Sequence, residues 1–278
     1  MKMKETVDMN YQQVFKRYEL KYILNPQQKD ALLEAMADHM QLDQYGMTTI
    51  RNIYYDTDNY QLIRASLMKP AYKEKLRIRS YGRAGRQDMV FVELKKKYDS
   101  VVYKRRLTLP QAKAMNCLEE RKPFPEDSQI SREIDYFNNF YENLHPAAFV
   151  SYDREAYVPV GGGDLRITLD KNIRGRTEEL TLDSEAYGAR IIGDDMTLVE
   201  VKTGVGYPMW FVKVLTEQHI FKTSFSKYGR VYESIIYPEL TGQKTALQLD
   251  YAEDSYWQGV YGSNTYGQSV YDGGAIYA

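Results

Sequence analysis

Charged and apolar residues alternate along at least seven stretches of the chain, a pattern typical of β-strands with one polar and one apolar face. In one stretch, Arg77 and Arg79 share a face, whereas Leu76 and Ile78 lie on the other. The seven stretches are residues 15–24, 73–81, 89–97, 101–109, 149–158, 165–170 and 199–202. We therefore predict an antiparallel sheet with one polar and one apolar face.

Helix-start signals and apolar residues at helical spacing predict four amphipathic helices. A proline and a glutamine follow Asn25, which indicates an N-cap, a proline at the first helical position and a capping box. The sequence Asp58–Gln61 predicts a second capping box, apolar residues around Phe137 predict a third helix, and Pro208 starts a fourth. Each helix has one apolar face with which to pack on the rest of the protein. The chain is therefore expected to be of the α+β class.

The polar faces of the predicted strands carry far more basic than acidic residues. The basic residues are Lys21, Arg77, Arg79, Lys95, Lys97, Lys104, Arg106, Arg154, Arg166 and Lys202, and the acidic ones are Glu19, Glu93 and Glu200. Like charges on neighbouring strands repel, although the whole chain is nearly neutral, with 37 Lys and Arg against 38 Asp and Glu. The pattern fits either an ordinary solvated sheet face or a polyanion site, and the concentration of cations favours the second.

A barrel accommodates this pattern if its charged faces point inward and its apolar faces point outward beneath the helices. The lumen would then be a basic tunnel with a few carboxylates that can hold a divalent cation. Arginine forms bidentate contacts with phosphate oxygens and lysine supplies point charge, so such a tunnel suits a linear run of phosphates.

Composition and motifs exclude several other classes of protein. The single cysteine, Cys117, excludes a disulfide framework and a cysteine-based zinc cluster. The three histidines lack metal-ligand spacing, and the chain contains neither a P-loop motif nor a motif for Ser-His-Asp catalysis. Near-neutral charge argues against a general nucleic-acid partner. Without a transmembrane-length apolar run or a signal peptide, we expect a soluble, cytoplasmic protein.

The last part of the chain differs in composition from the rest. From about Gly242 onward, tyrosines recur every five residues among Gly, Ser, Gln and Asn, at Tyr251, Tyr256, Tyr261, Tyr266 and Tyr271. This period fits neither a helix nor a strand. We expect residues 1–240 to form the folded domain and residues 241–278 a disordered low-complexity tail. The alternative is a tyrosine-rich segment that binds a protein partner or self-associates.

Eight short motifs of charged residues follow one another along the chain. They are Glu19-x-Lys21, Arg77-Ile78-Arg79, Phe91-Val92-Glu93-Leu94-Lys95, Lys104-x-Arg106, Ser151-Tyr152-x-Arg154, Arg166-Ile167-Thr168-Leu169-Asp170, Glu200-Val201-Lys202 and Phe225-Ser226-Lys227-Tyr228. This series, from about Phe15 to Tyr237, resembles the VTC domain, the polyphosphate polymerase module of the vacuolar transporter chaperone complex, which has stand-alone bacterial relatives. That family belongs to the triphosphate tunnel metalloenzymes, alongside the CYTH phosphatases and adenylyl cyclases. The resemblance implies an antiparallel eight-stranded β-barrel with helices packed outside.

The resemblance also implies roles for individual residues. Lys21, Lys227 and Glu200 would be catalytic, and Glu200, together with Glu19 and Glu93, would hold Mn²⁺ or Mg²⁺. The phosphate-binding residues would be Arg77, Arg79, Lys95, Lys104, Arg106, Arg154, Arg166, Lys202 and Ser226. The substrates would be ATP and inorganic polyphosphate, with the γ-phosphoryl group passing to the growing chain.

One position departs from the CYTH hydrolases, which typically begin with Glu-x-Glu-x-Lys. Arg17 occupies the first Glu position here, and the loss of a metal carboxylate should weaken a two-metal hydrolytic arrangement. This favours a polymerase, but two alternatives stay open: a metal-dependent hydrolase of tripolyphosphate or nucleoside triphosphates, and a non-catalytic polyphosphate-binding scaffold. Eukaryotic VTC proteins also carry an SPX domain and membrane helices. Neither occurs in this sequence, so we expect any membrane partner to be a separate chain.

Overall fold

Eight long strands and three short ones form one antiparallel sheet in the computed structural model, which describes residues 18–99 and 101–242. The long strands are β1 (Tyr18–Leu24), β3 (Thr48–Asp56), β4 (Tyr72–Tyr81), β5 (Met89–Tyr98), β6 (Val101–Pro110), β7 (His145–Pro159), β8 (Arg166–Arg176) and β10 (Thr197–Thr203). The short ones are β2 (Met40–Leu42), β9 (Ala189–Arg190) and β11 (Lys222–Thr223). Of the tyrosine-rich tail predicted for residues 241–278, the part from residue 243 onward lies outside the described residues, as does Arg17.

Helices connect the strands and follow the last of them. They are α1 (Pro26–Met36), α2 (Gln61–Leu67), α3 (Gln111–Glu119), α4 (Gln129–Phe140), α5 (Met209–Glu217) and α6 (Lys227–Val231), then a π-helical turn η1 (Tyr232–Ile236) and α7 (Tyr237–Thr241). Among the described residues, none of these helices combines the length and apolar character needed to cross a bilayer.

The strand order is β11-β1-β10-β8-β7-β3-β4-β5-β6, with β2 beside β7 and β9 beside β8. The predicted α+β class with an antiparallel sheet is confirmed. The predicted closed, eight-stranded barrel is wrong, because no pairing between described residues joins β6 to the other end of the sheet, and three short strands are added. One physical reason lies at β1, where β11 occupies the outer edge at Lys21 and Tyr22 and so blocks β6 from pairing there.

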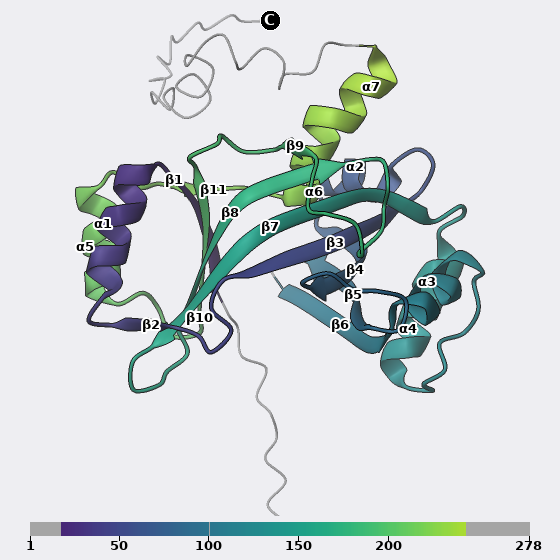
Figure 1. The fold of residues 1–278 in the computed structure, drawn as a ribbon, viewed down its shortest axis with the longest axis horizontal. Coiled ribbons are helices and arrows are strands. Elements are labelled where there is room, and N and C mark those ends of the chain that lie inside the picture. The colour runs from purple at the N-terminus through teal and green to yellow at the C-terminus, as the bar shows by residue number, and fades with distance from the viewer. Residues whose placement is uncertain (1–17, 100, 243–278) are drawn as a thin grey trace, which may run out of the picture.

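Helices cover the apolar face of the sheet. Tyr22, Leu169 and Val199 from the strands pack with Leu32 of α1 and Phe211 of α5 in one buried cluster. A second cluster joins the apolar side chains of β4, β5 and β6 to α3 and α4. Figure 1 shows α1 and α5 together at the left of the view, near β1 and β10, and α3 and α4 together at the right, near β5 and β6. Full burial of one large apolar side chain stabilises the fold by about 1.5–3 kcal/mol, so these clusters supply much of its stability.

The opposite face of the sheet carries the charged residues and curves around them. Five strands lie between β1 and β5 in the sheet order. Burial nevertheless lowers the pKa of Lys95 on β5, and Glu19 on β1 opposes this effect. The Lys75 Nζ of β4 donates a 2.8 Å hydrogen bond to the Oγ of Ser226, just before α6. The two ends of the sheet therefore face each other, and we call the concave, charged side the inner face.

Helix α6 packs against this inner face. The Tyr228 ring stacks on that of Tyr54, with centroids 4.8 Å apart, and its hydroxyl donates to the buried Asp56 at 2.9 Å. The Ser226 Oγ caps the helix by accepting from the Gly229 amide at 3.1 Å. The cap places Lys227, the first residue of the helix, beside the charged strands.

The predicted helix starts are correct in one case and wrong in another. Asn25 Oδ1 accepts from the Gln28 amide at 2.8 Å, and the Gln28 side chain accepts in return, as the capping box predicts. The box predicted at Asp58 does not form. Instead, Asp56 at the end of β3 accepts from the amides of Leu62 and Ile63 at 2.8 and 2.9 Å. The strand places this carboxylate directly beneath the first turn of α2.

Substitution of Asp56 by Ala should lower the free energy of unfolding by about 2–3 kcal/mol, because the buried amides of α2 and the Tyr228 hydroxyl lose their acceptor. Urea denaturation followed by circular dichroism measures this change. The matched control is Asp58→Ala, which removes the exposed, sequence-predicted cap and should cost no more than about 0.5 kcal/mol. Equal losses in the two variants would contradict the assignment.

Candidate functional site

Glu93 lies at the centre of a cluster of four cations on the inner face. Its carboxylate is 1% exposed and lies 2.7 Å from both Arg77 Nη2 and Lys104 Nζ, and 2.5 Å from Arg106 Nη2. The Arg79 Nη1 is more distant, at 3.9 Å. Arg77, Glu93 and Arg106 come from three adjacent strands and are directly opposite one another in register. Burial alone would raise the pKa of Glu93, but Arg77, Arg79 and Lys104 hold it well below its usual range.

Neighbouring polar side chains fix the two arginines of β4. Arg77 Nη1 donates to the Tyr54 hydroxyl at 3.0 Å. Arg79 donates to Asn52 Oδ1 at 2.9 Å and to the Tyr152 hydroxyl at 3.0 Å. Buried partners on β3 and β7 therefore orient both guanidinium groups, so that little rotamer entropy remains to be lost when they bind an anion.

A second cluster surrounds Glu200 and Asp170 on β10 and β8. Arg154 holds Asp170 by two hydrogen bonds of 2.6 and 2.7 Å. Lys227 Nζ bridges the two acids, at 2.5 Å from Asp170 and 3.4 Å from Glu200, while Lys21 Nζ lies 3.2 Å from Glu200. Burial would raise the pKa of Glu200, but Lys227, Lys21 and Arg154 keep it well below its ordinary value.

The second cluster continues to the edge of β1. Lys202 Nζ lies 3.6 Å from Glu19 and 3.9 Å from Glu200, and Lys21 Nζ lies 3.8 Å from Glu19. Four cations therefore stand against three carboxylates here, and four against one around Glu93. This excess of positive charge in a half-buried trough attracts polyanions.

Most of the predicted site residues come together on the inner face. The two clusters contain Glu19, Lys21, Arg77, Arg79, Glu93, Lys104, Arg106, Arg154, Glu200, Lys202 and Lys227. Lys95 lies opposite Lys104 in register, and Ser226 accepts from Lys75. Arg166 is the exception: it is exposed and donates to the carbonyls of Gly163 and Leu165 at 3.5 and 3.3 Å.

The sequence reasoning left Asp170 and Lys75 out of the predicted site. The alternation of side chains already placed both on the polar faces of their strands, because Asp170 shares a face with Thr168 and Lys75 shares a face with Arg77. Lys75 had no signal that distinguished it from a surface charge, and Asp170 stood in the motif Arg166-Ile167-Thr168-Leu169-Asp170 without an assigned role. The contacts of Asp170 with Lys227 and of Lys75 with Ser226 join residues far apart in the chain.

The three predicted metal carboxylates differ in their fitness to hold a cation. Glu93 does not fit, because it is 1% exposed and three cations lie within 2.7 Å of its oxygens, whereas the cations around Glu200 lie 3.2–3.9 Å away. Glu19 and Glu200 both lie within 4 Å of Lys21. Among the described residues, no group of three or more His, Cys, Asp or Glu side chains forms a ready-made metal cage. The donors present fit an Mg²⁺- or Mn²⁺-like ion held by one or two carboxylates with phosphate oxygens completing the coordination.

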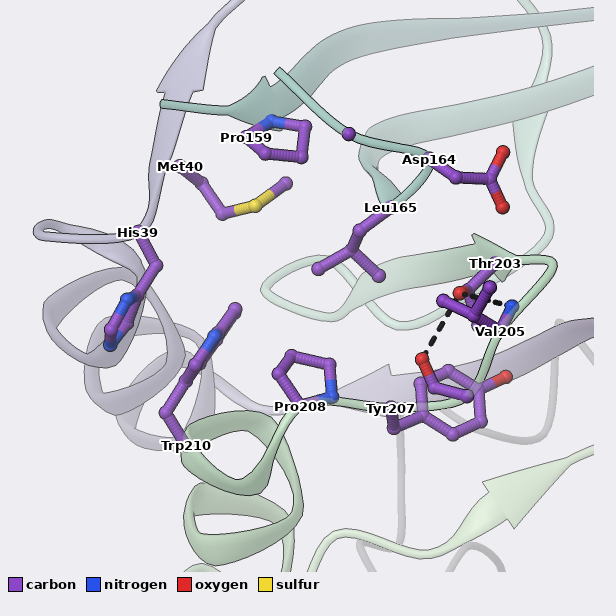
Figure 2. Close-up of a pocket in the computed structure, with 12 residues that line it drawn as sticks. His39, Met40, Pro159, Asp164, Leu165, Thr203, Val205, Tyr207, Pro208 and Trp210 are labelled. Atoms are coloured by element: carbon purple, nitrogen blue, oxygen red, sulfur yellow. Dashed lines mark hydrogen bonds between the residues drawn. The ribbon is translucent and has the colours of Figure 1, made fainter. Parts of the chain in front are cut away.

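A cavity of about 480 Å³ lies away from the two clusters. Figure 2 shows His39, Leu165, Tyr207 and Trp210 around it, from the region between α1 and β2, the β7–β8 connection and the start of α5. The His39 and Trp210 rings stack with centroids 4.9 Å apart. None of the predicted phosphate ligands lines this cavity, so the inner face, and not the cavity, is the candidate site.

The fold and the site define a class: an α+β protein whose curved antiparallel sheet brings arginines and lysines together on its concave face. The VTC domain model matches residues 16–236, so the chain belongs to the VTC domain family. A comparison with curated proteins returns no match.

Two solved structures of candidate adenylate cyclases are similar to this chain. One, from Bacillus halodurans, is 17% identical, with a TM-score of 0.47, and the match covers 75% of this chain and 92% of that one. The other, from Vibrio parahaemolyticus, is 13% identical, with a TM-score of 0.44, and the match covers 77% and 97% of the two chains.

Substitution of Glu93 by Gln should destabilise the protein by about 3 kcal/mol at pH 7, because the four cations lose the charge that offsets their repulsion. Tripolyphosphate should then raise the midpoint of thermal unfolding more in Glu93→Gln than in wild type, since it supplies the missing negative charge. Calorimetry with and without tripolyphosphate measures this difference. Glu133→Gln, which removes the partner of Arg105 outside the site, should respond like wild type. Identical shifts in all three proteins would refute this role of Glu93.

The same carboxylate predicts a pH dependence of stability. The pKa of Glu93 is lower in the folded than in the unfolded chain. The ionised carboxylate therefore adds to the free energy of unfolding above the unfolded pKa of about 4.3, and this contribution is lost as the pH falls towards the folded pKa. Wild type should therefore lose stability below about pH 4.3, and Glu93→Gln should lose less over the same range. Urea titrations at a series of pH values test the difference in slope.

Proposed function

We propose that this protein is a polyphosphate polymerase, which transfers the γ-phosphoryl group of ATP to the end of an inorganic polyphosphate chain on the inner face. The observation that carries the proposal is the convergence of Lys21, Arg154 and Lys227 on Glu200 and Asp170, beside the cations around Glu93. Membership of the VTC domain family supports the same activity.

The reaction needs positioning and electrostatic stabilisation more than covalent help from the protein. A terminal phosphate oxygen of the chain attacks the γ-phosphorus of ATP. The bond from that phosphorus to the β–γ bridging oxygen breaks, and ADP leaves with the electron pair. Because the acceptor is already an anionic oxygen, no side-chain nucleophile is required. Cations on the inner face hold donor and acceptor in line and offset the charge on the transferring group.

The residues around Glu93 and Glu200 have different roles in this reaction. Arg77 and Arg79 are held in fixed orientations by buried partners, which suits bidentate contacts with phosphate oxygens. Lys21 and Lys227 supply charge next to Glu200. Asp170 holds Arg154 and Lys227 by hydrogen bonds and acts as a positioning residue.

A divalent cation would be held by Glu200 and Glu19, with phosphate oxygens as its other ligands. When bound, Mg²⁺ or Mn²⁺ would neutralise part of the phosphate charge. Lys21 and Lys202 form ion pairs with these carboxylates and keep their oxygens in place. Their ammonium groups would also offset part of the negative charge of the phosphates.

The alternative hydrolase would need a group that activates water. Glu93 and Glu200 have lowered pKa values because cations surround them, and such carboxylates are weak general bases. This favours an acceptor that needs no deprotonation, as the end of a polyphosphate chain does. It supports chain growth over hydrolysis within the same family.

Incubation with ATP, Mn²⁺ and a trace of pyrophosphate, followed by ³¹P NMR, should show growth of the signal from internal phosphates. Arg106→Ala should reduce the initial rate at least tenfold through loss of a charge-assisted phosphate contact, and Glu200→Gln or EDTA should abolish it. The matched control is Arg105→Ala, which changes the next residue of β6 and removes an ion pair with Glu133. It should retain nearly full activity.

Other outcomes of this experiment select the alternatives. Orthophosphate and ADP without internal phosphate would identify a hydrolase. Retained polyphosphate binding without any turnover would identify a non-catalytic scaffold. Full activity in Glu200→Gln would overturn the assigned site.

A further inference from the structure

A cavity of about 350 Å³ lies between β4, β5 and the end of α4, on the side of the sheet away from the inner face. Tyr72 and Glu74 alternate with Lys73 and Lys75 along β4, so they point away from the charged clusters. Most of the lining side chains are aromatic, and the whole set is Tyr72, Glu74, Lys96, Tyr136, Phe137, Phe140 and Tyr141. We call this hollow the aromatic cavity. The proposed reaction uses none of these residues, so the cavity is separate from the phosphate site.

The carboxylate of Glu74 is buried in the wall of this cavity, with 8% of the residue exposed. Its Oε2 accepts a 2.6 Å hydrogen bond from the Tyr72 hydroxyl, and its Oε1 accepts one of 2.6 Å from the Tyr141 hydroxyl. Burial and the hydrogen bond to Glu74 raise the pKa of each phenol, so both remain protonated donors. The hydroxyls are neutral, and they leave the negative charge of the carboxylate in place.

This charge has no cationic partner within the part of the chain that the structure describes. No lysine, arginine or histidine nitrogen among these residues lies within 4 Å of the Glu74 oxygens. Lys96 lies directly opposite Glu74 in register and lines the cavity, yet the two form no ion pair at that distance. Together with the hydrogen bond from Arg105, the charge of Lys96 lowers the pKa of Glu133 on α4 instead. A buried carboxylate without a counterion is costly, and a cationic ligand would remove that cost.

Exposed aromatic rings lie beside the carboxylate. Tyr136 and Phe140, one turn apart on α4, are 66% and 61% exposed, and their rings stack with centroids 5.9 Å apart. The Phe140 ring meets the Tyr141 ring at 87°, with centroids 5.0 Å apart, so the aromatic surfaces face in more than one direction. The face of an aromatic ring attracts a cation within about 6 Å of its centroid. Exposed aromatic side chains around a hollow are typical of a binding site and not of a packed core.

The composition of the aromatic cavity indicates the chemistry of its ligand. An anion is disfavoured, because the Glu74 carboxylate would repel it. A primary ammonium has three N–H donors to satisfy, whereas both Glu74 oxygens already accept phenolic protons. A quaternary ammonium has no N–H donor, and aromatic rings are the groups that bind such a cation. Its methyl groups can pack on the rings while Glu74 offsets its charge.

We propose that the aromatic cavity is a binding site for a small molecule with a quaternary ammonium group, which packs its methyl groups against Tyr136 and Phe140 and places its charge beside Glu74. The site lies outside the inner face and is independent of the proposed function, because it requires neither polyphosphate nor turnover. Lys96 weakens the binding, since a second cation at the wall repels the ligand.

The test uses choline as the probe. Choline is titrated into the full chain, without ATP or metal, and binding is followed by saturation-transfer NMR of its methyl protons. The comparison ligand is the neutral dimethylbutanol analogue, in which a carbon atom replaces the nitrogen, so that the shape is kept and the charge is lost. Choline should bind at least about tenfold more tightly than the analogue, because only the cation is attracted by Glu74 and the ring faces. Tripolyphosphate should not displace choline, because it binds on the other face of the sheet.

Two variants test the carboxylate and the rings separately. Glu74→Gln should weaken choline binding about tenfold, whereas the matched control Glu133→Gln removes a carboxylate outside the cavity and should bind like wild type. Phe140→Leu should weaken choline binding about fivefold, because the cation loses one ring face. Its matched control is Phe221→Leu, which changes a 78% exposed aromatic residue elsewhere and should have no effect.

A third variant should act in the opposite direction. Lys96→Met removes the cation at the wall and should strengthen choline binding about threefold. The affinity for the neutral analogue should stay unchanged in this variant. A change in the packing of the cavity alone would alter the affinities for both ligands, so this comparison separates charge from shape.

Three results would overturn the proposal: a dissociation constant of wild type for choline above about 10 mM, equal affinities for choline and the neutral analogue, or unchanged choline affinity in Phe140→Leu. Because Phe140 is exposed, that variant keeps the test decisive if circular dichroism shows that Glu74→Gln does not fold. Chain growth from ATP is measured separately, so the polymerase and this site can each stand or fall alone.

Discussion

The concentration of like charge on one face of the sheet is the constraint on which the rest of this structure depends. Four cations around Glu93 and four around Glu19, Asp170 and Glu200 repel one another, and the carboxylates offset only part of that repulsion. Curvature of the sheet increases the effect, because it brings β1 close to β4 and β5 and reduces the water between them. The remaining charge is available to an anionic ligand.

The apolar face of the sheet supplies the stability that offsets the repulsion between the cations on the inner face. Helices α1, α3, α4 and α5 bury its apolar residues in two large clusters, and burial on that scale outweighs the repulsion. The two faces thus have separate tasks. Helix α6 packs on the inner face, where it stacks Tyr228 on Tyr54 and places Lys227 beside Asp170.

Strands in which charged and apolar residues alternate were predictable, and β3, which lacks that alternation, was not. Alternation identified β4, β5 and β6 nearly to their ends. β3 was missed because it lies in the middle of the sheet and is buried on both faces, which removes the alternation. For the same reason Asp56, at the end of β3, carried no signal as the cap of α2, while the exposed Asp58 matched the capping pattern better.

The sequence by itself determined which residues share a face, because side-chain direction alternates along a strand whatever the strand packs against. This was enough to group nearly all the cations of the site and to identify the family resemblance. Only the tertiary structure decided which carboxylate each cation meets, that Asp170 and Lys75 join the site, and that Arg166 turns to loop carbonyls instead. It also decided that the sheet stays open, since β11 occupies the edge of β1 at Lys21. These outcomes depend on contacts between residues far apart in the chain, which a local pattern does not encode.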